Sequence, residues 1–347
     1  MAFKLLSFAP YPEDGTSQYR CWGPLNEVRR LIPDLDLVSL HTLSSNPAGT
    51  RLSWVEMGMV DGVMLQRPFA PEHVSIAHMA KLHKKPLWVD YDDDLFTVPK
   101  DNPTHLNYNT PQVKQGIEAI CKMADIITVS TKFLGEKLAK FNPKVMVVPN
   151  GLNMRMLHRL DDALPRTKQV LWRGSWCHFT DLHEHTEQIL AAYNQFPEWG
   201  WTFVGYNPTW ITNKMDTEKR CRFLPFDNDY TTYMSNMQKL RAAVQIVPLI
   251  PIDFNLAKSR IAHIEGSFAG SAVLAPDWEE WQDGKLYRYS GVHDFQEKLF
   301  KMLSTPLEDL AATNNQDWYW VSKHRTLAIT NEFRRGIIEA FRRGPSV

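Results

Sequence analysis

The chain has 347 residues, which is enough for two domains with complete cores. Its 39 basic and 39 acidic side chains cancel to a formal net charge of zero, which counts against a protein built to grip duplex nucleic acid. No apolar run reaches the about 18 residues of a membrane span, and the four cysteines form no close pairs that would indicate a zinc site or a disulfide scaffold. Reduced thiols and a start without a signal-peptide pattern predict a cytoplasmic protein.

The first half alternates strands and helices. Apolar runs predict strands over 4–9, 35–40, 61–66, 85–89 and 125–130, and a strand with its turn over 144–151. Helices are expected over 23–31, 71–84, 112–124 and 131–141. This alternation is typical of a doubly wound α/β domain, in which ligands bind at the carboxyl ends of the strands.

Two loops of this half follow strands and contain polar residues. The turn-rich loop over 10–20 contains Gly15, and the order of strand, glycine-containing loop and helix is typical of a phosphate-binding loop, although one glycine is a weak signal. The strand over 85–89 is followed by four carboxylates, at Asp90, Asp92, Asp93 and Asp94. Such a cluster can bind a divalent metal, supply a general base, position an acceptor hydroxyl or shape a loop.

The alternation restarts after a polar stretch. We place a linker at 156–167, between a first domain over 1–155 and a second over 168–320. Strands are predicted over 168–172, 201–206, 221–226, 242–250 and 271–275, with helices over 185–196, 230–241, 295–303 and 306–313. The Arg-rich end, over 318–343, reads as one or two helices.

The most informative stretch runs from 254 to 270. Asn255 can cap a helix that begins near Leu256 and ends at Gly270, which puts Lys258 in the first turn. Glu265 then lies about 10 Å further along the axis, close to the same face. A cation and a carboxylate at this spacing suit a nucleoside diphosphate, with phosphates at Lys258 and ribose hydroxyls at Glu265. The plain alternative is a surface helix with a solvated lysine and glutamate.

This stretch resembles the nucleotide-sugar signature of GT-B glycosyltransferases of the retaining, family-4-like type. Glu265 matches the second of the two signature glutamates, whereas the first falls on Ala257, so the chain departs from the pattern at the residue that usually contacts the donor sugar. Divergent members carry Phe-Asn and then Lys-Ser here, as this chain does at 254–255 and at Lys258 and Ser259.

Other segments extend the resemblance. Gly15, Tyr19 and Arg20 are similar to the loop that faces the interdomain cleft, and residues 147–152 are similar to the interdomain end of the first domain. The turn after the strand over 168–172 resembles the donor-phosphate loop, which Arg173, Gly174, Ser175 and His178 would line.

The resemblance implies two Rossmann-like domains that face a cleft, with residues 321–347 forming a helix that packs back on the first domain. It places the donor against the second domain and the acceptor against the first. The implied donor-binding residues are Gly15, Arg173, Gly174, Ser175, His178, Asn255, Lys258, Ser259 and Glu265. The implied acceptor-side residues are Tyr19, Arg20, Asp90, Asp92 and Asp93. Catalytic roles are expected for Lys258, Arg173, Asp92 and Asp94.

The expected reaction transfers a sugar from a nucleoside diphosphate donor to a hydroxyl acceptor, with retention and without a metal or another tightly bound cofactor. A divalent metal at Asp92 and Asp94 is the alternative to metal independence. Three other classes stay open: a silent nucleotide-sugar binder, an epimerase or phosphorylase on the same fold, and a virus-type glycosyltransferase acting on modified DNA bases. The sequence leaves the sugar, the base, the acceptor and the oligomeric state undetermined.

Overall fold

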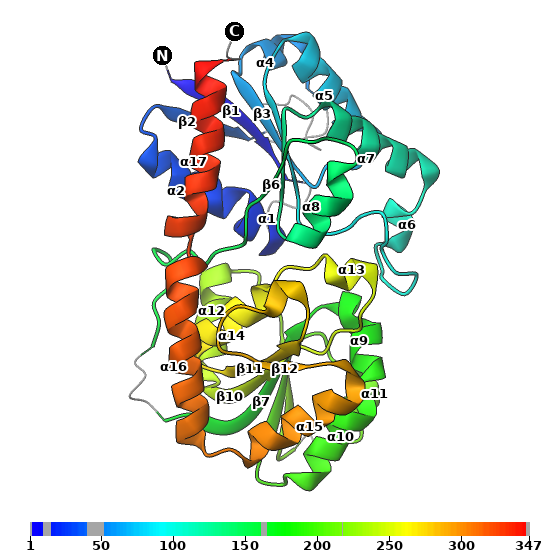
Figure 1. The fold of residues 1–347 in the computed structure, drawn as a ribbon, viewed down its shortest axis with the longest axis vertical. Helices are drawn as coiled ribbons and strands as arrows, with labels where there is room; N and C mark the ends of the chain where they lie inside the picture. The colour runs from blue at the N-terminus through cyan, green and yellow to red at the C-terminus, as the bar shows by residue number, and fades with distance from the viewer. Residues whose placement is uncertain (1, 10–14, 40–51, 161–164, 217, 345–347) are drawn as a thin grey trace.

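The protein folds into two parallel β-sheets with helices on both faces, stacked one above the other in Figure 1. This computed structural model describes residues 2–9, 15–39, 52–160, 165–216 and 218–344. Each sheet has six strands, and every strand pair in it is parallel. The predicted fold class, two doubly wound α/β units, is confirmed.

The first sheet has the strand order β2-β1-β3-β4-β5-β6. Every residue of β3 and β4 is buried, as expected for parallel strands covered by helices on both faces. The strands are β1 (Phe3–Phe8), β2 (Leu35–Ser39), β3 (Gly62–Gln66), β4 (Leu87–Tyr91), β5 (Ile126–Val129) and β6 (Val145–Val147). The helices are α1 (Gly15–Arg20), α2 (Trp22–Leu31), α4 (Trp54–Gly58), α5 (Pro71–Leu82), α6 (His105–Tyr108), α7 (Pro111–Met123) and α8 (Lys132–Ala139).

The second sheet has the order β12-β11-β10-β7-β8-β9. Its strands are β7 (Thr167–Gly174), β8 (Gly200–Gly205), β9 (Cys221–Pro225), β10 (Ala242–Ile246), β11 (Ala272–Pro276) and β12 (Tyr287–Tyr289). Its helices are α9 (Phe179–Glu184), α10 (Thr186–Gln195), α11 (Thr209–Thr212), α12 (Tyr230–Lys239), α13 (Asp253–Leu256), α14 (Ile261–Ala269), α15 (Gly291–Ser304) and α16 (Leu307–His324). A single turn of 3₁₀ helix, Trp176–His178, joins β7 to α9.

The last helix, α17 (Leu327–Arg343), leaves the second domain and packs on the first (Figure 1). Ile337 and Ile338 join the apolar cluster that contains Phe3 and Leu5 of β1. Asn331 Nδ2 also donates to the Pro24 carbonyl of α2 at 3.0 Å. The break before α17 has a tertiary cause, because the amide of Leu152 bonds the Arg325 carbonyl at 2.8 Å and the Leu152 carbonyl accepts from Leu327 at 2.9 Å.

Several local predictions were wrong. Residues 15–20, predicted as loop, form α1. The helix predicted to start near Leu256 is two helices, α13 and α14, and Lys258 lies in the loop between them rather than in a first turn. Asn255 is not an N-cap, because its amide donates to Asp181 at 2.7 Å and to the Ile250 carbonyl at 3.0 Å. The predicted helix end at Gly270 agrees with the structure, because Gly270 follows α14 with φ 93°, in the left-handed region that favours glycine.

Candidate functional site

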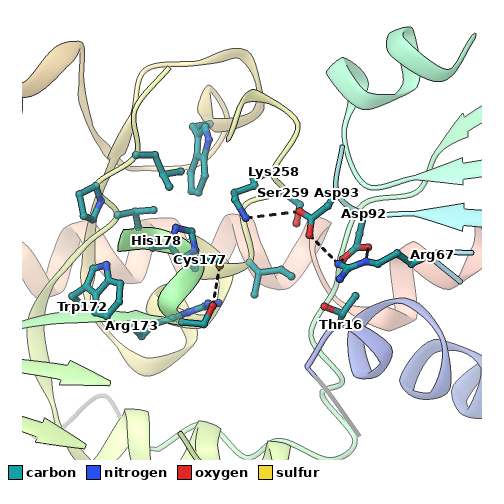
Figure 2. Close-up of a pocket in the computed structure, with 17 residues that line it drawn as sticks. Thr16, Arg67, Asp92, Asp93, Trp172, Arg173, Cys177, His178, Lys258 and Ser259 are labelled. Carbon is teal, nitrogen blue, oxygen red and sulfur yellow. Dashed lines mark hydrogen bonds and ion pairs between the residues drawn. The ribbon is translucent and has the colours of Figure 1, made fainter. Parts of the chain in front are cut away.

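The two sheets point the carboxyl ends of their strands at the same space between the domains. In each sheet the order reverses at one place, between β1 and β3 in the first and between β7 and β10 in the second. Crevices of parallel sheets form at such reversals, outside the carboxyl ends of the strands. A cavity of about 290 Å³ lies there. The first domain lines it with Thr16, Arg67, Asp92 and Asp93, and the second with Trp172, Arg173, Ser175, Cys177, His178, Val247, Pro248, Leu249, Lys258, Ser259, Ile261, Ala262 and Trp281 (Figure 2).

Three cationic side chains line the second domain's wall. Arg173 is the second-last residue of β7, His178 ends the 3₁₀ turn, and Lys258 follows α13. Burial opposes the charge of Lys258, but the negative charges of Asp93, Cys177 and Asp181 together outweigh burial and raise the lysine pKa. The Lys258 ammonium also lies 4.5 Å from the centre of the Phe254 ring, a cation–π distance. This wall is therefore suited to an anionic ligand.

His178 is the third of these cations because of its neighbours. Its Nδ1 lies 2.9 Å from a carboxylate oxygen of Asp181. Burial would lower the imidazole pKa, but the Cys177 thiolate and the bond to Asp181 outweigh burial and raise that pKa to about 9. Asp181 is itself held by the amide of Ile250 at 3.0 Å and by Asn255, so the imidazole has a fixed orientation.

The first domain's wall carries a carboxylate cluster clamped by one arginine. Arg67, after β3, bonds Asp92 through two nitrogens at 2.9 and 2.7 Å, and bonds Asp93 at 2.9 Å. Burial raises the pKa of Asp92. For Asp93 the charges of Lys258, Arg67 and His178 overcome burial and lower its pKa, which keeps it ionised. Asp93 also reaches across the cavity, with a carboxylate oxygen 3.8 Å from the Lys258 ammonium (Figure 2).

Glu265 lies behind this cavity and does not line it. Its two carboxylate oxygens accept from the hydroxyls of Tyr19 at 2.7 Å and Tyr233 at 2.9 Å, and it pairs with Arg173. Because Tyr19 belongs to α1 and Tyr233 to α12, this buried carboxylate ties the two domains together. Glu265 is linked to the cavity through Arg173, which lines it.

Other predicted site residues have internal partners. Arg20 and Asp90 form an ion pair with no exposed side-chain surface, through bonds of 2.9 and 2.6 Å. Asp90 also lies inside β4 rather than after it. Asp94 is buried, where it bonds Lys137 at 2.5 Å and Thr97 at 2.6 Å. These three side chains hold the loops around the cavity in place and do not line it.

The remaining predicted residues divide between the cavity and its surroundings. Ser175 and Ser259 line the cavity, and Ser259 accepts from the Asn150 amide of the first domain at 2.8 Å. Gly174 needs to be small, because a Cβ there would lie 2.6 Å from the Trp172 ring. Asn255 is buried and supports Asp181, while Gly15 is exposed at the start of α1.

Sequence reasoning missed Arg67, Thr16 and Cys177 as lining residues. Arg67 offered a signal, since a cation directly after a buried strand lies at the ligand-binding edge of a sheet. The structure adds that Arg67 adopts φ 48°, which is unusual outside glycine. Among the described residues, no group of three or more His, Cys, Asp or Glu side chains is arranged to hold a metal ion. Within the same ranges, no helix combines the length and apolar character needed to cross a membrane.

Solved structures share this two-domain fold over most of the chain. HepE of Anabaena in complex with UDP superposes with a TM-score of 0.64 at 12% identity, covering 98% of this chain and 100% of that one. The pneumococcal O-GlcNAc transferase GtfA, in complex with UDP and GlcNAc, gives a TM-score of 0.55 at 12% identity, covering 83% of this chain and 59% of that one. The fold is GT-B.

A third GT-B neighbour is described as a putative UDP-N-acetylglucosamine 2-epimerase from Listeria monocytogenes. Its TM-score is 0.54 at 12% identity, covering 98% of this chain and 95% of that one. No protein-family model matches the sequence, and no curated protein sequence is significantly similar to it. At such identities the likeness establishes a shared GT-B fold and not a shared reaction.

Proposed function

We propose that this protein is a glycosyltransferase that moves a sugar from a nucleoside diphosphate donor to a hydroxyl acceptor. The observation that carries the proposal is the interdomain cavity, where Arg173, His178 and Lys258 face Asp92 and Asp93. Cations from one domain and carboxylates from the other suit a ligand that is anionic at one end and rich in hydroxyls at the other. HepE, solved in complex with UDP and with UDP-glucose, supports this choice of donor class.

The donor diphosphate is assigned to the second domain's wall. When the sugar leaves, negative charge builds up on the diphosphate, and preorganised cations stabilise that charge without having to rearrange. Lys258 and Arg173 supply this stabilisation, with His178 as a third cation. Ser175, Ser259 and the close backbone approach at Gly174 complete the donor side, with Asn255 in support. Gly15, at the start of α1 in the first domain, is also assigned to donor binding.

Glu265 has an indirect part in donor binding. It holds Arg173 in the cavity wall, and a direct bond to ribose requires the Tyr19 hydroxyl to leave the carboxylate. Tyr19, from the acceptor-side domain, therefore controls whether Glu265 of the donor-side domain is free to bind ribose. Arg20 and Asp90 act by keeping α1 in place.

The acceptor hydroxyl is assigned to the side of Asp92 and Asp93. Asp93 is ionised and shared between Arg67 and Lys258, so a diphosphate that binds Lys258 frees Asp93 to accept a hydrogen bond from a sugar or acceptor hydroxyl. We propose retention of configuration and no metal. If the reaction inverts instead, Asp92 or Asp93 is the base.

A thermal-shift screen tests the donor assignment. A ligand that binds only the folded protein stabilises it by about 2.7 kcal/mol at a hundred times its dissociation constant, so the matching nucleoside diphosphate raises the melting temperature. The screen compares UDP, ADP and GDP, their sugars and the free nucleosides. Slow release of the diphosphate from the best donor without acceptor then separates an enzyme from a silent binder. Failure of every nucleotide to stabilise the protein would refute the proposal.

A second candidate reaction is epimerisation of the sugar while it remains nucleotide-bound or after its transient release. It is favoured by the epimerase-named GT-B neighbour, which matches 95% of its own length. Incubation of the best donor in deuterated water, without acceptor, distinguishes the two. An epimerase produces a deuterated sugar isomer, whereas a transferase returns the donor sugar without carbon-bound deuterium.

A further inference from the structure

The four cysteines of the chain have sharply different surroundings. Cys21, Cys121 and Cys221 are buried within the apolar clusters of the two domains. Cys177 is half-buried and lines the interdomain cavity, in the 3₁₀ turn after β7. It is thus the cysteine that a small molecule entering the cavity meets.

Cys177 lies among groups that stabilise a thiolate. The Ser175 hydroxyl is 2.9 Å from its sulfur. His178, the next residue, is held by Asp181, which leaves its other ring nitrogen for the sulfur. The Lys258 ammonium adds a second positive charge from the loop between α13 and α14. Cys177, His178 and Asp181 therefore form a nucleophile, base and carboxylate series.

We propose that Cys177 is a modification site, at which the cysteine sulfur attacks small electrophiles and peroxides that enter the cavity. The charged groups that act on the sulfur are His178 from its own turn and Lys258 from the loop between α13 and α14. Asp181 and, across the cavity, Asp93 act on it through these two cations.

The acidities agree with this geometry. Burial alone raises the pKa of the Cys177 thiol, but the charges of His178 and Lys258 outweigh burial and lower that pKa to about 6. Burial raises the pKa of Cys121 to about 12 and that of Cys221 to about 11, and it also raises that of Cys21. Only a thiolate attacks, so the other three are slow on two grounds, access and ionisation.

The chemistry needs only the modifying reagent. With iodoacetamide, the sulfur forms a bond to carbon and iodide leaves. With a peroxide, the sulfur forms a bond to one oxygen, the O–O bond breaks, and the departing hydroxide takes a proton from solvent or His178. The sulfur is oxidised by two electrons to a sulfenic acid and the peroxide is reduced to water. Either adduct adds bulk beside His178 and Lys258.

The test is the pH profile of alkylation of the intact protein by iodoacetamide, followed at each cysteine by peptide mass spectrometry. At pH 6 about half of Cys177 is thiolate, compared with about 0.3% of an ordinary thiol of pKa about 8.5. Lower basicity reduces nucleophilicity by about tenfold, so we expect about tenfold faster labelling than an unstructured cysteine peptide at pH 6 and slower labelling at pH 8.5. This crossover is specific to a stabilised thiolate.

Two variants and one ligand complete the design. Cys177→Ser removes the fast label, and His178→Gln moves the half-maximal rate to higher pH, with melting temperatures recorded for both. A Cys177 rate that follows the unstructured cysteine peptide at every pH, or a fast label on another cysteine, overturns the proposal, and this needs only the wild-type protein. UDP is added separately. If UDP does not slow the label, the donor assignment is weakened while the modification site stands.

Discussion

Replacing Lys258 with alanine tests the donor assignment most directly. The Lys258 side chain is 15% exposed, and its ammonium faces the cavity 3.8 Å from Asp93. Losing a charge-assisted hydrogen bond to phosphate costs about 1.5–3 kcal/mol, which is about 10- to 150-fold in affinity. In the wild-type protein the Lys258 ammonium must give up its ion pair with Asp93 before it binds phosphate, and this cost offsets part of the gain. We therefore expect the loss of UDP affinity to lie at the lower end of this range, about tenfold. Turnover should fall further, by about 10²–10³, since the charge on the diphosphate grows in the transition state.

Calorimetry with UDP and with uridine measures the effect. Lys258→Ala should weaken the binding of UDP and leave the binding of uridine almost unchanged. Lys137→Ala is the matched control, because its ammonium also bridges the domains, bonding Asp94 at 2.5 Å and Asp253 at 2.8 Å, but it does not line the cavity. Equal losses for UDP and uridine would show that Lys258 does not meet phosphate. An equal loss in Lys137→Ala would show that the effect comes from loosening the domain contact.

Three further outcomes are expected. Arg20→Leu should lower the free energy of unfolding by about 3–5 kcal/mol in urea titrations, since it leaves Asp90 buried and unpaired, and a change below about 1 kcal/mol would refute the structural role of the pair. UDP affinity should fall as the pH rises through about 9, because His178 loses its charge there. The His178→Gln variant should not show this loss of affinity. Ionisation of the uracil ring affects both proteins equally, so the difference between them reports on His178. Transferase activity should survive EDTA, and loss that manganese or magnesium restores would make Asp92 and Asp94 metal ligands.

The fold could be predicted because its signals are local. Buried parallel strands are mostly apolar runs, such as those of β3, β4 and β10, and the polar stretch before Thr167 separates two such series. The helix end at Gly270 also follows from local backbone preference. Each of these features depends on residues close together in the chain.

The errors come from contacts between distant residues. Arg20 reaches Asp90, 70 positions away, and Tyr19 reaches Glu265, 246 positions away, so nothing local predicts that residues 15–20 form a helix. Asn255 has the side chain of a helix cap, but its bonds to Asp181 and to the Ile250 carbonyl use that side chain elsewhere. The predicted spacing of Lys258 and Glu265 requires one continuous helix, whereas the chain forms two helices with Lys258 between them.

Position 257 explains how the site differs from the GT-B signature. Ala257 is fully buried in the apolar cluster of the first domain, and its carbonyl accepts from the Thr131 hydroxyl at 2.9 Å. A glutamate there would bury an unpaired charge in the domain interface, at a cost of several kcal/mol. The carboxylates that line the cavity in the described part of the chain are Asp92 and Asp93, both from the loop after β4. A reaction that needs a carboxylate beside the donor sugar therefore draws it from the opposite domain, where Asp93 already meets Lys258 across the cavity.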